Sequence, residues 1–354
     1  MRARKFAVLA VLALIVAGCG DGEFRPAANA SGSAAEARLL TYDFAASEQL
    51  TYRFEMSLDL DMSVAGLPAG QGKMTMGLDL SGITGYTVEE GPEPGTVRLA
   101  IEQTVERVAV REFMVDGVSM AQDFDDEMAM TLAEEQGMLP EMAVVLDDSG
   151  NVLWIEMDGA PISGDLFGGD LGAGLIPGGG LGGVEGFLGP AFPDEPVGVG
   201  DRWDVATTQE LPLLGPVTIE QDYHVVDVQS VAGATVHVID GEIRMDDLKI
   251  DLAEMIRSMA SDPAAAELLG MSPEELAGMA AMPADFAMTM EMSFREGSDR
   301  TWFDQAEGMV LRSDSHVVVD MVMDMDFAGE RFSADATVVM DLTLERTGGG
   351  TAAA

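Results

Sequence analysis

Apolar and polar residues alternate strictly over several long stretches of the chain, and the clearest stretch covers residues 50–64. Its even positions are all apolar, whereas the odd positions between them are polar or charged. Successive side chains of a strand point to opposite faces, so this pattern predicts a long antiparallel strand with one buried face. The alternation resumes from Met74 to Leu80, beyond a loop with Pro68, which predicts a hairpin.

Further strands are predicted along most of the remaining chain. In residues 97–114 the apolar residues stand at odd positions up to Val105 and at even positions from Val108 onward. This change of face predicts a bulge near Glu106. Residues 332–344 repeat the clean alternation of the first strand. The other expected strands cover residues 120–132, 141–147, 151–158, 201–209, 216–230, 234–246, 284–296, 300–304, 308–327 and 331–346.

One block, residues 247–282, has a helical period instead. An apolar stripe at helical spacing runs along its first part: Leu252, Met255, Ile256 and Met259. Asp262 and Ser272 are each followed by proline and resemble helix starts, so three short helices are predicted. Because a sheet with one apolar face must cover it, we expect a mostly β fold with a helical block (α+β), in which these helices cover a large antiparallel sheet.

A glycine-rich segment divides the strand pattern. Residues 159–190 contain thirteen glycines and three prolines, and their apolar residues are isolated. This composition predicts a long irregular insertion that is mobile in the free protein. We expect residues 38–346 to form one β domain around this insertion, and residues 347–354 to be a disordered tail.

The single cysteine, Cys19, ends a short N-terminal segment. Three cations come first, residues 6–15 are apolar, and small residues then lead to Cys19, which is the order of a secretory signal. This segment resembles the lipobox of bacterial lipoproteins. The resemblance implies that residues 1–18 are removed and that Cys19 is acylated. The alternative, an uncleaved membrane helix, has only residues 6–18 for a span that takes roughly 20.

Residues 19–37 are small and polar in composition, which predicts a flexible tether. With Cys19 acylated no thiol is left, so disulfides and cysteine-based metal sites are excluded.

The net charge of −43 excludes several kinds of partner. Such a surface repels nucleic acid and anionic lipid headgroups, so the acyl chains must hold the protein at the membrane. The acidic residues are spread along the whole chain, which favours a solvated surface over a cation-binding site. Such a surface is also compatible with adaptation to high salt, where screening weakens the repulsion between the acids.

No catalytic pattern is present, and we expect no enzyme, metal site or cofactor. His224, His237 and His316 lie on separate predicted strands without metal-ligand spacing. Asp148-Ser149-Gly150 matches the motif of aspartic proteases, but that chemistry needs two aspartates that share a proton, and the chain has no second copy of the motif. The same three residues suit a hairpin turn.

Methionine is unusually frequent, with 26 copies. Most copies fall where core residues of strands or of the helical stripe are expected. Three interpretations remain open: core packing, a soft wall that faces a variable apolar ligand, and copper(I) binding through thioethers.

Two further segments carry a resemblance. Residues 192–203 (FPDEPVGVGDRW) and 301–310 (TWFDQAEGMV), together with the lipobox and the long strands, resemble uncharacterised envelope lipoproteins related to the Lol-type and mycobacterial lipoprotein carriers. The resemblance implies a strongly curved, half-barrel antiparallel sheet whose concave side is closed by helices. In characterised carriers that cavity holds acyl chains.

We therefore expect an extracytoplasmic lipoprotein, anchored by its acyl chains to a bacterial membrane, that binds a lipid or another apolar ligand. The alternative is a structural or interaction lipoprotein with a filled core; no protein partner is indicated. The expected ligand-binding wall consists of Phe54, Met56, Leu58, Met76, Leu78, Met255, Ile256 and Met259.

Overall fold

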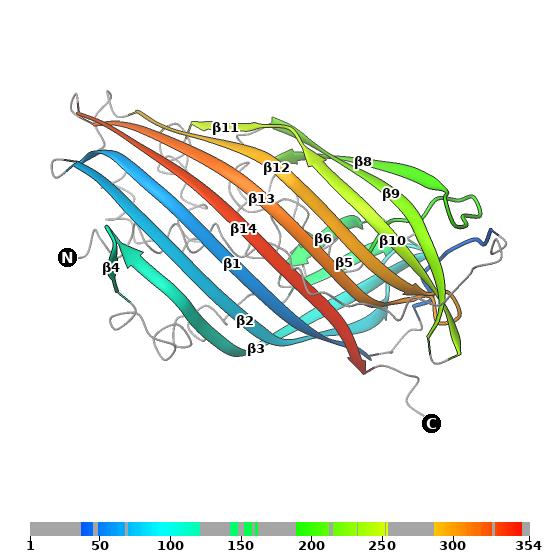
Figure 1. Ribbon diagram of the computed structural model, residues 1–354. Coiled ribbons are helices and arrows are strands. Elements are labelled where there is room, and N and C mark those ends of the chain that lie inside the picture. Colours follow the sequence, from blue (N-terminus) through cyan, green and yellow to red (C-terminus); the bar gives the residue numbers. More distant parts are fainter. Residues whose placement is uncertain are drawn as a thin grey trace.

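The long alternating segments form one antiparallel sheet of fourteen strands (Figure 1). The computed structural model describes residues 37–44, 49–67, 70–120, 142–147, 152–157, 160–161, 189–211, 215–231, 233–251, 253, 287–327 and 330–348. The strands are β1 (Gln49–Leu67), β2 (Gly70–Glu90), β3 (Thr96–Val115), β4 (Val118–Ser119), β5 (Met142–Asp147), β6 (Val152–Met157), β7 (Ala160–Pro161), β8 (Arg202–Leu211), β9 (Gly215–Val231), β10 (Ala234–Met245), β11 (Leu248–Asp251), β12 (Ala287–Asp304), β13 (Met309–Phe327) and β14 (Glu330–Gly348).

The first and last long strands lie side by side in the middle of this sheet. The strand order is β7-β6-β5-β3-β2-β1-β14-β13-β12-β10-β9-β8, with β4 beside β3 and β11 beside β12. In the described part the pairing ends at β7 and β8, so the sheet is open. Figure 1 shows the long strands crossing the molecule obliquely, with β1 next to β14. Since β1 and β14 are far apart in sequence, the sheet is complete only when both ends of the domain are in place.

The predicted α+β class, a sheet covered by short helices, is wrong. Every element of the described residues is a strand. Residues 248–251, at the start of the predicted helical block, form β11 and pair with β12. Leu248 and Ile250 are buried, whereas Lys249 and Asp251 are exposed, so a two-residue period governs this segment. Pairing with β12 holds residues 248–251 extended, so the helical spacing of the apolar residues 252–259 does not continue back over them.

Two details of the strand predictions can be compared with the structure. The bulge near Glu106 is confirmed, because Ser81 pairs with Arg107 while Gly82 pairs with Val105, leaving Glu106 as the extra residue. The expected break between strands at residues 297–299 is absent, since β12 continues to Asp304 with a bulge near Arg295.

Several other predicted segments lie mostly outside the described residues: the N-terminal signal with Cys19 and the tether, the strand at 120–132, the glycine-rich insertion, the three helices expected up to residue 282, and the disordered tail. Within them, residues 160–161 form β7 and residues 347–348 end β14.

The register places the apolar positions of neighbouring strands opposite one another, on what we call the inner face. Leu58 of β1 lies between Met340 of β14 and Leu78 of β2, and Val317 of β13 lies opposite Met340. A slip of one residue would turn every such side chain to the other face. The apolar alternation of the sequence therefore fixes the register of the whole central sheet.

One end of the inner face is closed by aromatic residues, and we call it the aromatic end. The Tyr42 ring lies 5.1 Å from that of Phe192 and 5.5 Å from that of Phe303. The Tyr42 hydroxyl donates a hydrogen bond of 3.0 Å to the carbonyl of Pro190. Gly189 has a φ of 100°, and a Cβ there would meet this hydroxyl at 2.9 Å. These contacts join the segments 37–44 and 189–201 to the sheet.

We predict that Phe303→Ala lowers the free energy of unfolding by about 3–5 kcal/mol, because the fully buried ring would leave a cavity among other rings. Val322→Ala, at a position 36% exposed, should change it by no more than about 0.5 kcal/mol. Urea unfolding followed by circular dichroism measures both. Equal effects of the two substitutions would contradict the described packing of the aromatic end.

Candidate functional site

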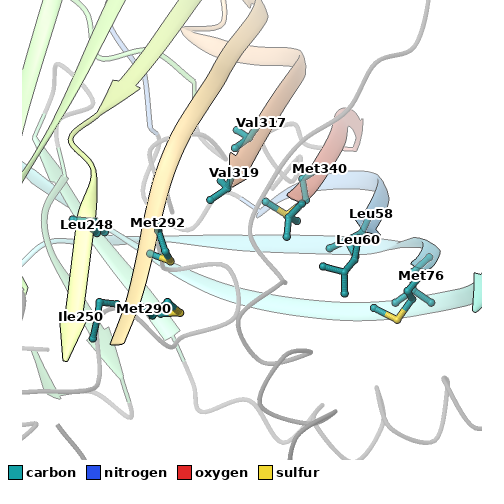
Figure 2. Packing of buried hydrophobic residues seen from close by; sticks show 12 residues of the cluster. Leu58, Leu60, Met76, Leu248, Ile250, Met290, Met292, Val317, Val319 and Met340 are labelled. Atoms are coloured by element: carbon teal, nitrogen blue, oxygen red, sulfur yellow. The ribbon is translucent and has the colours of Figure 1, made fainter. Parts of the chain in front are cut away.

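The other end of the inner face is a continuous apolar surface, which we call the inner patch. It crosses β2, β1, β14, β13, β12 and β11, and all of its side chains are buried. Its residues are Leu58, Leu60, Met76, Leu78, Leu248, Ile250, Met290, Met292, Val317, Val319, Val338 and Met340. Figure 2 shows side chains of β1, β2, β11, β12, β13 and β14 pointing toward a common interior.

Methionine is concentrated in and around the inner patch. Met292 lies opposite Met321, and Met62 lies opposite Met74, so methionines face one another across neighbouring strands. Eight methionines belong to the patch or pack against it: Met62, Met74, Met76, Met245, Met290, Met292, Met321 and Met340. The thioether is flexible and polarizable, so this surface can adapt to apolar groups of different shape.

The expected ligand-binding residues fall into three groups. Leu58, Met76 and Leu78 lie together in the inner patch. Phe54 and Met56 belong to the adjoining apolar cluster toward the start of β1. Met255, Ile256 and Met259 lie outside the described residues. The patch also contains residues of β11, β12, β13 and β14 that sequence reasoning did not select, although all except those of β11 lie in stretches with visible alternation.

A row of polar side chains borders the inner patch, and we call it the polar row. It consists of Asp299 and Thr301 on β12 and Ser313 and Ser315 on β13. Asp299 lies opposite Ser315, and Thr301 lies opposite Ser313. Thr301, Ser313 and Ser315 are almost fully buried. Ser315 precedes Val317 of the patch by two residues, so both side chains stand on the inner face.

Asp299 is the most perturbed group of this row. Its Oδ2 accepts a weak hydrogen bond of 3.4 Å from the Thr301 hydroxyl. Its Oδ1 is inaccessible to solvent and has no hydrogen-bond partner within the described part of the chain. Burial, and to a lesser degree the charge of Asp240, raises the pKa of Asp299 to about 7. Gly241 makes room for the carboxylate, since a Cβ there would lie 1.7 Å from Oδ1.

The three histidines do not form a common site. His237 is buried on the inner face, and burial lowers its pKa. The Nδ1 of His316 lies 2.7 Å from the Oδ1 of Asp341, and the Nδ1 of His224 lies 3.4 Å from Arg202. Over the described residues, no group of three or more histidine, cysteine or acidic side chains is arranged to hold a metal ion.

The outer face carries paired charges. Arg111 contacts Asp59 at 2.9 Å and Asp79 at 2.7 Å, and Arg300 contacts Asp240 at 2.6 Å. These side chains are between one third and about half exposed, so each pair stabilises the fold only weakly. The outer face is thus a solvated, acidic surface, and the chemically unusual groups lie inside.

Comparisons with known proteins give only distant structural likeness. No known family profile and no curated protein sequence matches the chain. A structure of lipovitellin aligns with 88% of this chain at 10% identity and a TM-score of 0.32, and the chain spans about a quarter (26%) of lipovitellin.

Two bacterial structures align over a similar share of the chain. A putative outer membrane lipoprotein-sorting protein domain from Vibrio parahaemolyticus aligns with 85% of this chain and 86% of its own, at 9% identity and a TM-score of 0.14. A DUF1329 family protein from Desulfovibrio piger aligns with 83% and 85%, at 9% identity and a TM-score of 0.14. Likeness at this level leaves the function to be argued from the residues themselves. Of the described residues, no helical segment is both long and apolar enough to cross a bilayer.

We predict that Asp299→Asn stabilises the protein at about pH 8 by roughly 2–4 kcal/mol, since one pKa unit corresponds to about 1.4 kcal/mol. The pKa of this carboxyl is 3.8 in the unfolded chain and about 7 in the folded protein. The carboxyl therefore lowers the free energy of unfolding progressively as the pH rises from about 4 to about 7. The gain should therefore vanish below about pH 4. Urea unfolding across this pH range measures it.

The matched control is Asp320→Asn on the outer face. Hydrogen bonds from Thr337 and Arg295 lower the pKa of Asp320, so its contribution is present above the unfolded pKa and is lost as the pH falls. This substitution should therefore lower the free energy of unfolding at neutral pH. A shift of the same sign in both variants would contradict the assigned environments.

Proposed function

We propose that this protein is an extracytoplasmic envelope lipoprotein, anchored through Cys19, that binds a lipid or a lipid-like apolar molecule on its inner patch. The observation that carries this proposal is the continuity of the patch. Buried apolar side chains of six neighbouring strands form one surface without a charged residue among them. A surface of apolar side chains contributed by six neighbouring strands suits the apolar chain of a lipid.

The methionine content supports a ligand of variable shape. Branched aliphatic residues have few rotamers and pack one way, whereas methionine side chains rearrange at low cost. The cross-strand pair Met292–Met321 places one such side chain in the inner patch and a second one against it. A protein that holds chains of different length or unsaturation benefits from this adaptability.

The hydrophobic effect supplies the main favourable contribution to such binding. Burying one methylene is worth about 0.8 kcal/mol, so about eight methylenes supply about 6 kcal/mol before the costs of ordering. The acidic outer surface repels anionic headgroups, which favours interior binding over adsorption to a membrane. Acylation of Cys19 would then provide the membrane attachment that the surface cannot.

The second candidate function is a structural or interaction lipoprotein with a filled core. One observation favours it: the patch residues are already buried, with Leu58 and Leu60 at 2% exposure. In that case the inner patch is ordinary core, and methionine is only a packing residue.

Native purification followed by organic extraction and mass spectrometry separates these two functions. We expect a lipid or another apolar molecule to copurify with the full-length, membrane-derived protein in a constant ratio, apart from the acyl chains on Cys19. No extractable molecule, together with no increase in thermal midpoint on addition of lipids, would contradict the proposed binding function.

We predict that Met62→Asp weakens the binding of an apolar fluorescent probe by at least about tenfold, because a carboxylate beside the patch must be desolvated when the probe binds. Met62 packs against the patch while retaining partial exposure, so the protein should still fold. The control is Ser63→Asp, which places the same charge on the exposed side of β1 between Lys73 and Asp335. Equal loss in both variants, measured by fluorescence titration, would count against binding at the inner patch.

A further inference from the structure

Asp299 occupies a place where an apolar residue would be more stable. None of the other inner-facing residues of β12 is charged. Before Asp299 they are Met288, Met290, Met292, Phe294 and Gly297, and after it they are Thr301 and Phe303. An ionised carboxylate in such surroundings is costly unless it is paired. The residues directly opposite Asp299, Gly241 of β10 and Ser315 of β13, carry no positive charge that could pair with its carboxylate.

The groups around Asp299 leave one of its oxygens without a hydrogen-bond partner in the described part of the chain. Thr301 reaches only Oδ2, and weakly, while Oδ1 is unpartnered among the described residues and lies over Gly241. The nearest cation in sequence, Arg300, stands on the outer face and binds both carboxylate oxygens of Asp240, at 2.6 and 2.9 Å. On the inner face the Asp299 carboxylate therefore has one weak donor, Thr301 on Oδ2, and none on Oδ1 among the described residues.

The polar row extends this acceptor across two strands. Ser315 lies directly opposite Asp299, and Ser313 lies opposite Thr301, so three hydroxyl groups accompany one carboxylate. The row ends where the inner patch begins, with Ser315 two residues from Val317, or about 7 Å along β13. A molecule with a polar head and an apolar chain matches this succession of surfaces.

Resting on the proposed function, we propose that the polar row is a headgroup subsite, in which Asp299 accepts a hydrogen bond from the hydroxyl or ammonium head of an amphiphile whose chain lies on the inner patch. Carboxylic acid and phosphate heads are disfavoured, because their negative charge would approach the Asp299 carboxylate without a cation between them. The subsite thus selects a hydrogen-bond donor.

The test compares probes that share one chain and differ in the head: decylamine, decanol, decanoic acid and decyl methyl ether. Binding to the full-length protein is measured by displacement of an apolar fluorescent probe, at about pH 8 and about 0.5 M NaCl, where attraction of the amine to the acidic exterior is screened. We expect decylamine and decanol to bind at least about tenfold more tightly than decyl methyl ether, and decanoic acid to bind least.

The variant Asp299→Asn should bring decylamine to within about threefold of the ether, because the charge is removed while the shape is kept. Decyl methyl ether itself should bind this variant unchanged. The control Asp320→Asn, on the outer face of the neighbouring β13, should leave all four affinities unchanged. Ser315→Ala tests the row a second time and should reduce the preference for decanol without altering the binding of the ether.

The outcomes separate the two proposals. If no probe binds to the natural chain, the proposed function fails. If all four probes bind with affinities that do not depend on the head, or if Asp299→Asn weakens all of them equally, the inner patch binds chains but the headgroup subsite is refuted. The head preference of the natural chain decides the matter even where a variant does not fold.

Discussion

The structure depends on one constraint: the apolar face of a very wide open sheet must be kept from water. The pairing of β1 with β14 at its centre aligns the even positions of both strands, from Tyr52 with Arg346 to Val64 with Ala334. The flanking strands continue this pairing, with bulges in β3 and β12, and the apolar positions of six strands meet in the inner patch. A slip of one residue would expose that surface and bury the charges of the outer face.

The strands could be predicted because a sheet with one buried face requires apolar and polar residues to alternate along each strand. The same reasoning located the bulge at Glu106, where the apolar phase changes. The helical block was mispredicted at its start, because Leu248 precedes Leu252 by four residues, a helical spacing, whereas the pairing of β11 with β12 gives this segment a two-residue period.

The polar row could not be found from local pattern. Residues 297–299 read Gly-Ser-Asp, a composition typical of turns, yet β10 and β13 hold this segment extended on both sides. Asp299 becomes unusual only through residues distant in sequence, namely Gly241 beneath it and Ser315 beside it. The raised pKa of Asp299 is therefore a property of the assembled sheet.

The most direct measurement is nuclear magnetic resonance of methyl-labelled methionine in the presence and absence of decanol. If the inner patch binds the chain, the methyl signals of Met76, Met290, Met292 and Met340 shift in proportion to occupancy, while that of Met309, in the adjoining cluster, changes little. If these four signals stay in place while decanol binds, or if all methionine signals shift together, the account of the inner patch as a binding surface is contradicted.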